Sequence, residues 1–158
     1  MRRRRVSLLL VSLFIVAVAW GGVAGADTRT VDDGNDAAEG LDLKSASHGH
    51  APDGRLRHRI VSYNRIGGAE RTLYLEIVAD GHTYEFLPNG EVWKDTRDYP
   101  TGPSGHAAVS RPDERTIVYT FRKAVIGNPS AYRWRVRSVP MSTNSDRIPN
   151  TGRVTHDI

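Results

Sequence analysis

The sequence predicts an all-β fold: a single antiparallel β-sandwich, jelly-roll-like, that follows an N-terminal signal peptide. Short runs rich in β-branched and aromatic residues recur about every ten residues, and Gly, Pro, Asn and Asp separate them. No stretch has the apolar repeat of an amphipathic helix. Regular short strands without helices are typical of antiparallel sandwiches, and this pattern therefore predicts the fold class.

The individual strands are expected where apolar and polar side chains alternate. Leu73, Leu75 and Ile77 share one face of such a run, which indicates a strand with one buried and one solvated face. Asn89-Gly90 tolerates positive φ at both central positions of a type I′ turn and predicts a hairpin. The expected strands are residues 41–47, 55–63, 71–79, 82–87, 91–94, 106–110, 115–122 and 131–139.

The first 26 residues have the three parts of a secretory signal peptide. Arg2–Arg5 form a positive segment, Val6–Trp20 an apolar run, and Ala24–Ala26 a small-residue cleavage site. An uncleaved membrane anchor is the alternative, but the apolar run has fifteen residues where a spanning helix needs roughly 20. We therefore expect a secreted, extracellular protein whose mature chain has no transmembrane segment.

The mature chain is expected to be one domain without overall charge. Residues 27–40 are interpreted as an acidic extended leader and residues 41–158 as the sandwich, with 140–158 irregular and returning over the domain. Four of the 22 basic residues are in the signal peptide, so 18 remain to balance 18 acidic ones. This balance gives no support to nucleic-acid binding. The chain has no cysteine, so its stability must come from the core and from any bound ion.

An acidic stretch, DDGNDAAEGLD at residues 32–42, is the first candidate site. It is not an EF-hand loop, because the alternating pattern of acidic residues that such a loop needs is broken. Ca²⁺ nevertheless takes six to eight oxygen ligands in flexible geometry. Side-chain oxygens are available from Asp32, Asp33, Asn35, Asp36 and Asp42. A solvated entry loop is the alternative, because Asp, Asn and Gly are also the commonest turn residues.

Two arginine runs are the second candidate site. Arg133, Arg135 and Arg137 project from one face of a strand, and RLRHR at residues 55–59 repeats the pattern. Such a ladder can be a platform for acidic glycans or wall polymers. The alternative is a solvated face whose charge is balanced by cross-strand partners such as Glu76 and Glu85.

The histidines form a third candidate site, whereas the sequence contains no recognisable catalytic motif. His48 and His50 form an H-x-H pair, with His58 on the next expected strand, and imidazoles in this pattern can hold Zn or Cu. An ordinary pair of strand-end histidines is the alternative. The sequence has no nucleophile elbow, phosphate loop or zinc-protease helix, and we expect a protein that is not an enzyme.

The order of these motifs resembles a known group of proteins. "DDGNDAAEGLDLKSASHGH", "LRHRIVSYN" and "YRWRVRSV" followed by "SDRIPNTGRVTH" are similar to small secreted actinobacterial β-sandwich proteins of unknown function, and to DOMON-like and glucodextranase-type carbohydrate-binding modules. The resemblance implies that the acidic opening lies against the sandwich and helps to bind a structural calcium ion. It implies that the ligands are Asp33, Asn35, Asp36 and Asp42, with residues 146–150 close to them.

The function that we expect is a secreted, non-catalytic binding domain, stabilised by calcium, that binds a carbohydrate at the cell envelope. Its partner would be a polysaccharide or another envelope component. The expected ligand-binding residues are Arg133, Arg135 and Arg137, together with Tyr99 as an exposed aromatic in a proline-rich loop. An extracellular protein-interaction module with no small ligand and a histidine-based metal-binding protein are the alternatives.

Overall fold

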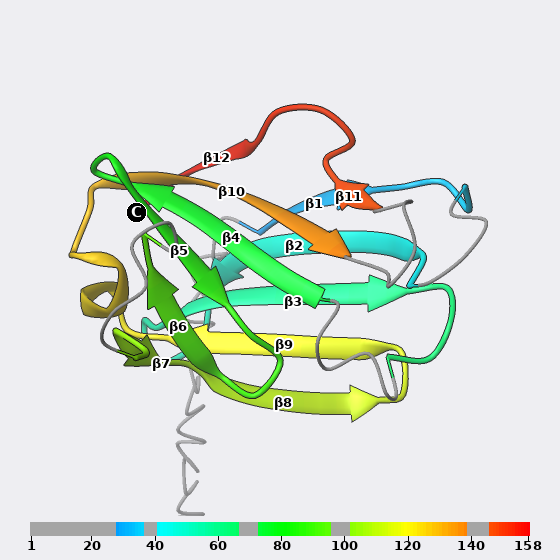
Figure 1. Ribbon diagram of the computed structural model, residues 1–158, viewed down its shortest axis with the longest axis horizontal. Helices are drawn as coiled ribbons and strands as arrows, with labels where there is room; N and C mark the ends of the chain where they lie inside the picture. Colours follow the sequence, from blue (N-terminus) through cyan, green and yellow to red (C-terminus); the bar gives the residue numbers. More distant parts are fainter. Residues whose placement is uncertain (1–27, 37–40, 67–72, 96–101, 139–145) are drawn as a thin grey trace, which may run out of the picture.

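The computed structural model has two antiparallel sheets packed face to face (Figure 1). It describes residues 28–36, 41–66, 73–95, 102–138 and 146–158. The all-β sandwich that the strand pattern predicts is therefore confirmed. The expected signal peptide lies outside the described residues. Within them, no helix combines the length and the apolar character needed to cross a membrane.

One sheet has five strands and is called the five-stranded sheet below. β3 is at its centre, and β1 and β8 are its two edges. β8 has a register shift between Ser110 and Asp113, so its pairing with β9 is irregular there. In spatial order the strands are β1 (Arg29–Asp32), β2 (Leu43–His50), β3 (Leu56–Ser62), β9 (Thr116–Phe121) and β8 (Ala108–Asp113).

The other sheet, called the seven-stranded sheet, is built around β10. β4 pairs with one side of β10, while β11 and β12 share its other side. A 3₁₀ helix, η1 (Lys123–Ile126), precedes β10. In spatial order the strands are β11 (Arg147–Ile148), β10 (Ala131–Ser138), β4 (Leu73–Ala79), β5 (His82–Phe86), β6 (Glu91–Lys94) and β7 (Gly105–His106), with β12 (Val154–Asp157) beside β10.

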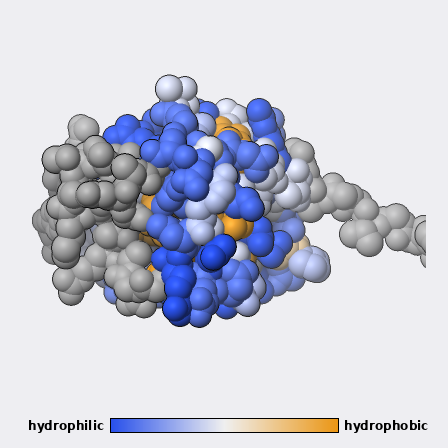
Figure 2. Space-filling view, turned by 90° about the vertical axis from the view of Figure 1, so that its right-hand side faces the viewer, coloured by the Kyte–Doolittle hydropathy of each residue, from blue (hydrophilic) through white to orange (hydrophobic). Residues whose placement is uncertain are grey.

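The core lies between the sheets and follows from the alternation of side chains. Leu73, Leu75 and Ile77 are all fully buried, as the sequence predicts, and Trp134 and Phe86 pack in the same core. Burying one such side chain contributes about 1.5–3 kcal/mol. The face drawn in Figure 2 is mostly hydrophilic, with scattered hydrophobic residues among those described. Alternation thus separates an apolar interior from polar outer faces.

The hairpin turns differ from the expectation in one detail. Gly90 has a positive φ of 91°, but Asn89 does not have a positive φ, so the predicted type I′ turn is wrong. Asn89 instead accepts a hydrogen bond from the amide of Glu91 through its side chain, at 3.0 Å. Positive φ at both positions occurs at Asp80 and Gly81, in the turn between β4 and β5.

The first and the last described segments contribute strands where the sequence predicts none. β1 lies in the expected leader and pairs with β2. β11 and β12 lie in the region expected to be irregular and pair with β10. Each of these strands has four residues or fewer, too few to show a clear alternation. β1 and β11 lie at the same end of the sandwich, on opposite sheets, and this places their flanking loops together (Figure 1).

Candidate functional site

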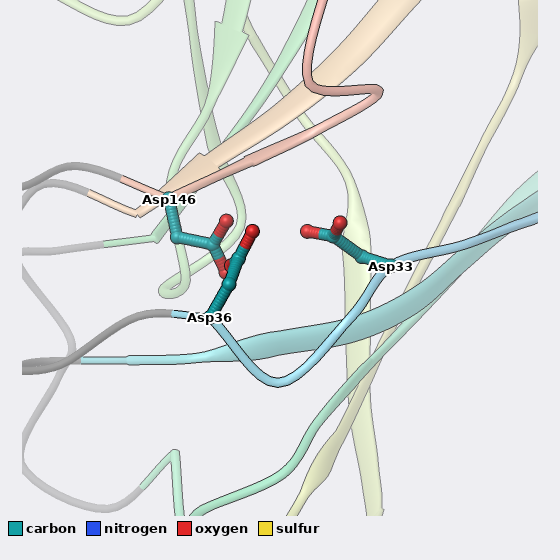
Figure 3. Close-up of side chains that lie close together, drawn as sticks. All are labelled: Asp33, Asp36 and Asp146. Atoms are coloured by element: carbon teal, nitrogen blue, oxygen red, sulfur yellow. The ribbon is translucent and has the colours of Figure 1, made fainter.

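Three carboxylates from distant parts of the chain converge at this end of the sandwich. Asp33 and Asp36 follow β1, and Asp146 directly precedes β11. A carboxylate oxygen of each lies within 4.8 Å of the others. Figure 3 shows the carboxylates turned toward one another from the two segments. We call Asp33, Asp36 and Asp146 the carboxylate cluster.

Backbone amides hold Asp146 in place. Its side chain accepts hydrogen bonds from the amide of Leu43, at 2.5 Å, and from the amide of Arg147, at 2.7 Å. Its own amide donates to the hydroxyl of Ser138, and its carbonyl accepts from the amide of Ser138 at 2.8 Å. Because Leu43 belongs to the five-stranded sheet and Ser138 to the other, Asp146 connects the two sheets. A carboxylate oxygen that accepts one hydrogen bond still has a second lone pair for a cation.

The backbone also fixes Asp33, while Asp36 is exposed. The amide of Asp33 donates to the carbonyl of Lys44 at 2.9 Å, and its carbonyl accepts from the hydroxyl of Tyr63 at 3.2 Å. The Oδ1 atom of Asp33 accepts from the amide of Gly34 at 3.0 Å. Its Oδ2 atom is buried and has no hydrogen-bond donor among the described residues. This oxygen is therefore available to a ligand that can approach it.

The electrostatics of the cluster are unfavourable without a counter-ion. The pKa of Asp146 is raised to about 6: burial raises it most, the negative charge of Asp33 adds to the rise, and the two amide hydrogen bonds oppose it. Among the described residues, no salt bridge includes a member of the cluster. A cation at this position would relieve the repulsion and favour the ionised form of Asp146.

The other expected calcium ligands lie apart from the cluster. Asn35 is exposed between Asp33 and Asp36. Asp42 is buried; its amide donates to the side chain of Asn64 at 3.2 Å and its carbonyl accepts from the amide of Tyr63. Its carboxylate does not belong to the group of mutually close ligand atoms. The resemblance placed residues 146–150 near the acidic opening, and the structure brings Asp146 there.

The arginine ladder of β10 is largely balanced by acidic partners. Arg135 donates to Glu76 at 2.7 Å, and Arg153 donates to the other oxygen of Glu76. Arg137 donates to Glu85 at 2.5 Å. Burial raises the pKa of Glu76, but the hydrogen bonds from Arg135 and Arg153 outweigh it and hold the pKa below 4.5. Two of the three expected ligand-binding arginines are therefore already paired.

The other two residues expected to bind the ligand are Arg133 and Tyr99. Arg133 is exposed and borders a depression of about 290 Å³ that Asp80 and Thr155 also line. Tyr99 lies outside the described residues.

A cluster of buried imidazoles lies in the interior, against the face of β10 that is opposite the arginine ladder. His48, His58 and His156 are at most 2% exposed. The ring centroids of His48 and His156 are 4.1 Å apart, and that of half-buried His50 is 5.3 Å from His156. Trp134 donates a hydrogen bond to Nδ1 of His48 at 2.7 Å. Sequence reasoning missed His156, because its imidazole neighbours His48 and His50 lie more than a hundred residues earlier in the chain.

His58 is the best defined of these imidazoles. Its Nε2 atom lies 2.7 Å from the hydroxyl of Tyr132, and its ring stacks on Phe121 at 6.0 Å. Burial lowers the pKa of His58 well below 6.5, and positive charge on His48 or His156 lowers it further. His58 is therefore neutral at pH 7. The histidines do not form a group of three ligand atoms as close as those of the carboxylate cluster.

Comparisons with protein-family models, with curated proteins and with solved structures found no match to this chain. The resemblance to carbohydrate-binding modules therefore stays a prediction. The protein class that fold and site define is an antiparallel β-sandwich with a cluster of carboxylates that joins its two sheets at one end.

Proposed function

We propose that this protein is a non-catalytic extracellular binding domain whose sandwich is stabilised by a calcium ion at the carboxylate cluster. The convergence of Asp33 and Asp36 with Asp146, more than a hundred residues later, carries the proposal. Local turn chemistry explains Asp33 and Asp36, which are close in sequence. It does not explain why a buried third carboxylate lies against them without a basic partner among the described residues.

The geometry favours calcium over other cations. The donors are hard oxygens, and the described cluster contains no imidazole, so the site suits Ca²⁺ or Mg²⁺ better than Zn²⁺ or Cu²⁺. Mg²⁺ requires near-ideal octahedral geometry, whereas Ca²⁺ accepts irregular sites with six to eight oxygens. Asp36 is exposed, so water can complete the coordination from that side.

An ion at this position would fasten the two sheets together. Asp33 continues from β1, at the edge of the five-stranded sheet, and Asp146 leads into β11 of the other sheet. The ion would bind the folded state only, because the unfolded chain does not hold these carboxylates together. A ligand with that property at a hundred times its dissociation constant adds about 2.7 kcal/mol to the free energy of unfolding.

Thermal unfolding tests this part of the proposal. Melts of the purified protein in EDTA, in millimolar Ca²⁺ and in millimolar Mg²⁺ should show an increase in melting temperature of several degrees, largest with Ca²⁺. Asp36→Asn should abolish the increase. Asp32→Asn is the matched control, because Asp32 is an exposed aspartate of the same segment outside the cluster, and this variant should keep the increase. Overlapping curves in EDTA and Ca²⁺ would overturn the proposal.

The binding role rests on a different support. The resemblance to carbohydrate-binding modules, the expected export of the chain and the polar outer faces of the sheets all favour a carbohydrate at the cell envelope as the ligand. A glycan array tests it, with the paired arginines of β10 as one candidate contact. Capture of a protein partner without any glycan signal would favour the alternative of a protein-interaction module.

A further inference from the structure

We infer that the outer face of the five-stranded sheet, at Arg57 and Arg59, is a docking surface for an acidic polysaccharide. The inference rests on the carbohydrate-binding role proposed above and names the surface and the class of ligand. It comes from a difference between two arginine ladders that look equivalent in the sequence. In one ladder, Arg135 and Arg137 both form salt bridges with glutamates. In the other, Arg55 pairs with Asp53, but among the described residues Arg57 and Arg59 form no salt bridge.

Arg57 and Arg59 lie at the centre of the five-stranded sheet. They are exposed, while the alternate residues of β3 are buried in the core. Their Cα atoms are two positions apart, roughly 7 Å along the strand. Gly49 and Thr120 flank Arg57 across the sheet, and small or short residues flank Arg59 in the same way. The two arginine side chains are therefore longer than their neighbours on the adjoining strands.

The surface around these arginines is rich in hydroxyl groups. A Cβ atom added at Gly49 would lie 2.7 Å from the hydroxyl oxygen of Thr28, so this glycine leaves room for the threonine beside Arg57. Thr28, Ser47, Arg57 and Arg59 line a notch of about 20 Å³, which is large enough for a single small group. Hydroxyl groups beside guanidinium groups suit a ligand that has both hydroxyl and acidic groups.

The charge on this surface is less compensated than that on β10. Among the described residues, neither Arg57 nor Arg59 forms a salt bridge. Arg59 donates a hydrogen bond to the hydroxyl of Thr116 at 3.5 Å. The pKa of Asp113 is lowered mainly by the hydrogen bond from the amide of Arg115, and the positive charge of Arg59 adds to this effect. Arg135 and Arg137 of the other sheet, by contrast, each contact a glutamate at 2.7 Å or less. Among the described residues, an anionic ligand therefore meets two neighbouring arginines outside any salt bridge on the five-stranded sheet, whereas on β10 only Arg133 is outside one.

A polymer fits this surface better than a single sugar. Guanidinium groups bind carboxylates with two parallel hydrogen bonds. An exposed ion pair of this kind contributes about 0–1 kcal/mol, so one uronic acid would bind weakly. A chain with repeated acidic units raises the local concentration of the second contact once the first is made. The described surface offers hydroxyl groups in place of apolar side chains, which favours a glycan over a lipid bilayer.

Titration of the purified protein with polygalacturonate tests the inference. The fully methyl-esterified polymer is the matched ligand control, because it keeps the backbone and loses the charge. Measurements in EDTA keep the result independent of the cation site. The wild-type protein should bind polygalacturonate at low salt, and the double variant Arg57→Gln with Arg59→Gln should lose at least tenfold in affinity. Arg133→Gln, an exposed arginine of the other sheet, should bind like the wild type.

Each outcome separates this inference from the proposed function. Equal binding of the charged and esterified polymers would support carbohydrate binding and overturn the arginine surface. Binding that Arg133→Gln weakens as much as the double variant would overturn it as well. Tighter, arginine-dependent binding to duplex DNA or to phosphatidylserine vesicles would overturn the choice of a glycan. A calcium-dependent melt with no polymer binding would support the cation site and overturn the docking surface.

Discussion

Acid should destabilise this protein through its buried imidazoles, and His58 allows this to be tested at one residue. His58 is fully buried, and its surroundings come from four strands: His48 of β2, Phe121 of β9, Tyr132 and Trp134 of β10, and His156 of β12. Its pKa lies well below 6.5 in the folded state, so the folded protein does not take up this proton when the unfolded chain does. The contribution of His58 to stability is therefore complete above pH 6.5 and is lost as the pH falls below it.

The magnitude follows from the number of protons taken up by the unfolded chain. While folded His58 stays neutral, each pH unit below 6.5 costs about 1.4 kcal/mol, so two units cost roughly 3 kcal/mol. This is a large share of the roughly 5–15 kcal/mol that stabilises an ordinary domain. Asp146 acts in the opposite direction: its pKa is raised to about 6, so protonation between pH 6 and pH 4 favours the folded state. A comparison of variants removes that contribution, because both proteins contain Asp146.

Urea unfolding of the wild type and of His58→Leu, followed by tryptophan fluorescence from pH 7 to pH 4.5, measures the effect. We expect the free energy of unfolding of the wild type to fall more than that of His58→Leu over this range, by at most roughly 3 kcal/mol. Tyr132→Phe is the control, because it removes the same hydrogen bond and keeps the imidazole; its pH dependence should match the wild type. Parallel curves for the wild type and His58→Leu would refute the reasoning.

Two further predictions concern stability. Gly90→Ala should destabilise the protein by more than 2 kcal/mol in thermal melts, because φ is 91° and the new Cβ would lie 2.5 Å from the carbonyl oxygen of Ala107. Gly81→Ala is the control: Gly81 also has a positive φ but has open space around it, so the loss should be nearer 1 kcal/mol. Glu76→Gln should lower the free energy of unfolding in urea by about 2–3 kcal/mol. This is less than the roughly 3–5 kcal/mol expected for a fully buried pair, because the arginines reach solvent. The control is Glu114→Gln, which removes an exposed pair and should cost about 0–1 kcal/mol; an equal loss in the two variants would contradict the prediction.

The parts of the fold that were predictable from sequence are those with local causes. Leu73, Leu75 and Ile77 alternate with polar neighbours, and alternation alone predicts that they share a buried face. β11 and β12 have no such pattern, because a strand of a few residues forms only when a long neighbour such as β10 offers its edge. Their existence depends on the tertiary fold, which the local sequence does not contain.

The candidate sites show the same division. Asp33 and Asp36 were predictable because acidic residues near glycines in one loop are visible in the sequence. Their junction with Asp146 depends on which strands lie at the two sheet edges, and only the resemblance pointed to it. The two arginine ladders have the same spacing, and cross-strand register alone decides that Arg135 meets Glu76 while Arg57 meets Gly49 and Thr120.

The irregular pairing of β8 has a consequence for how the sandwich ends. A regular edge strand presents a row of amide and carbonyl groups that can pair with a second chain and start aggregation. In β8 the register shift falls between Ser110 and Asp113, and Pro112, inside it, has no amide hydrogen to donate. Arg111 and Asp113 add opposite charges at the same exposed place. One proline and two charges therefore make this edge of the five-stranded sheet a poor template for a strand from another chain.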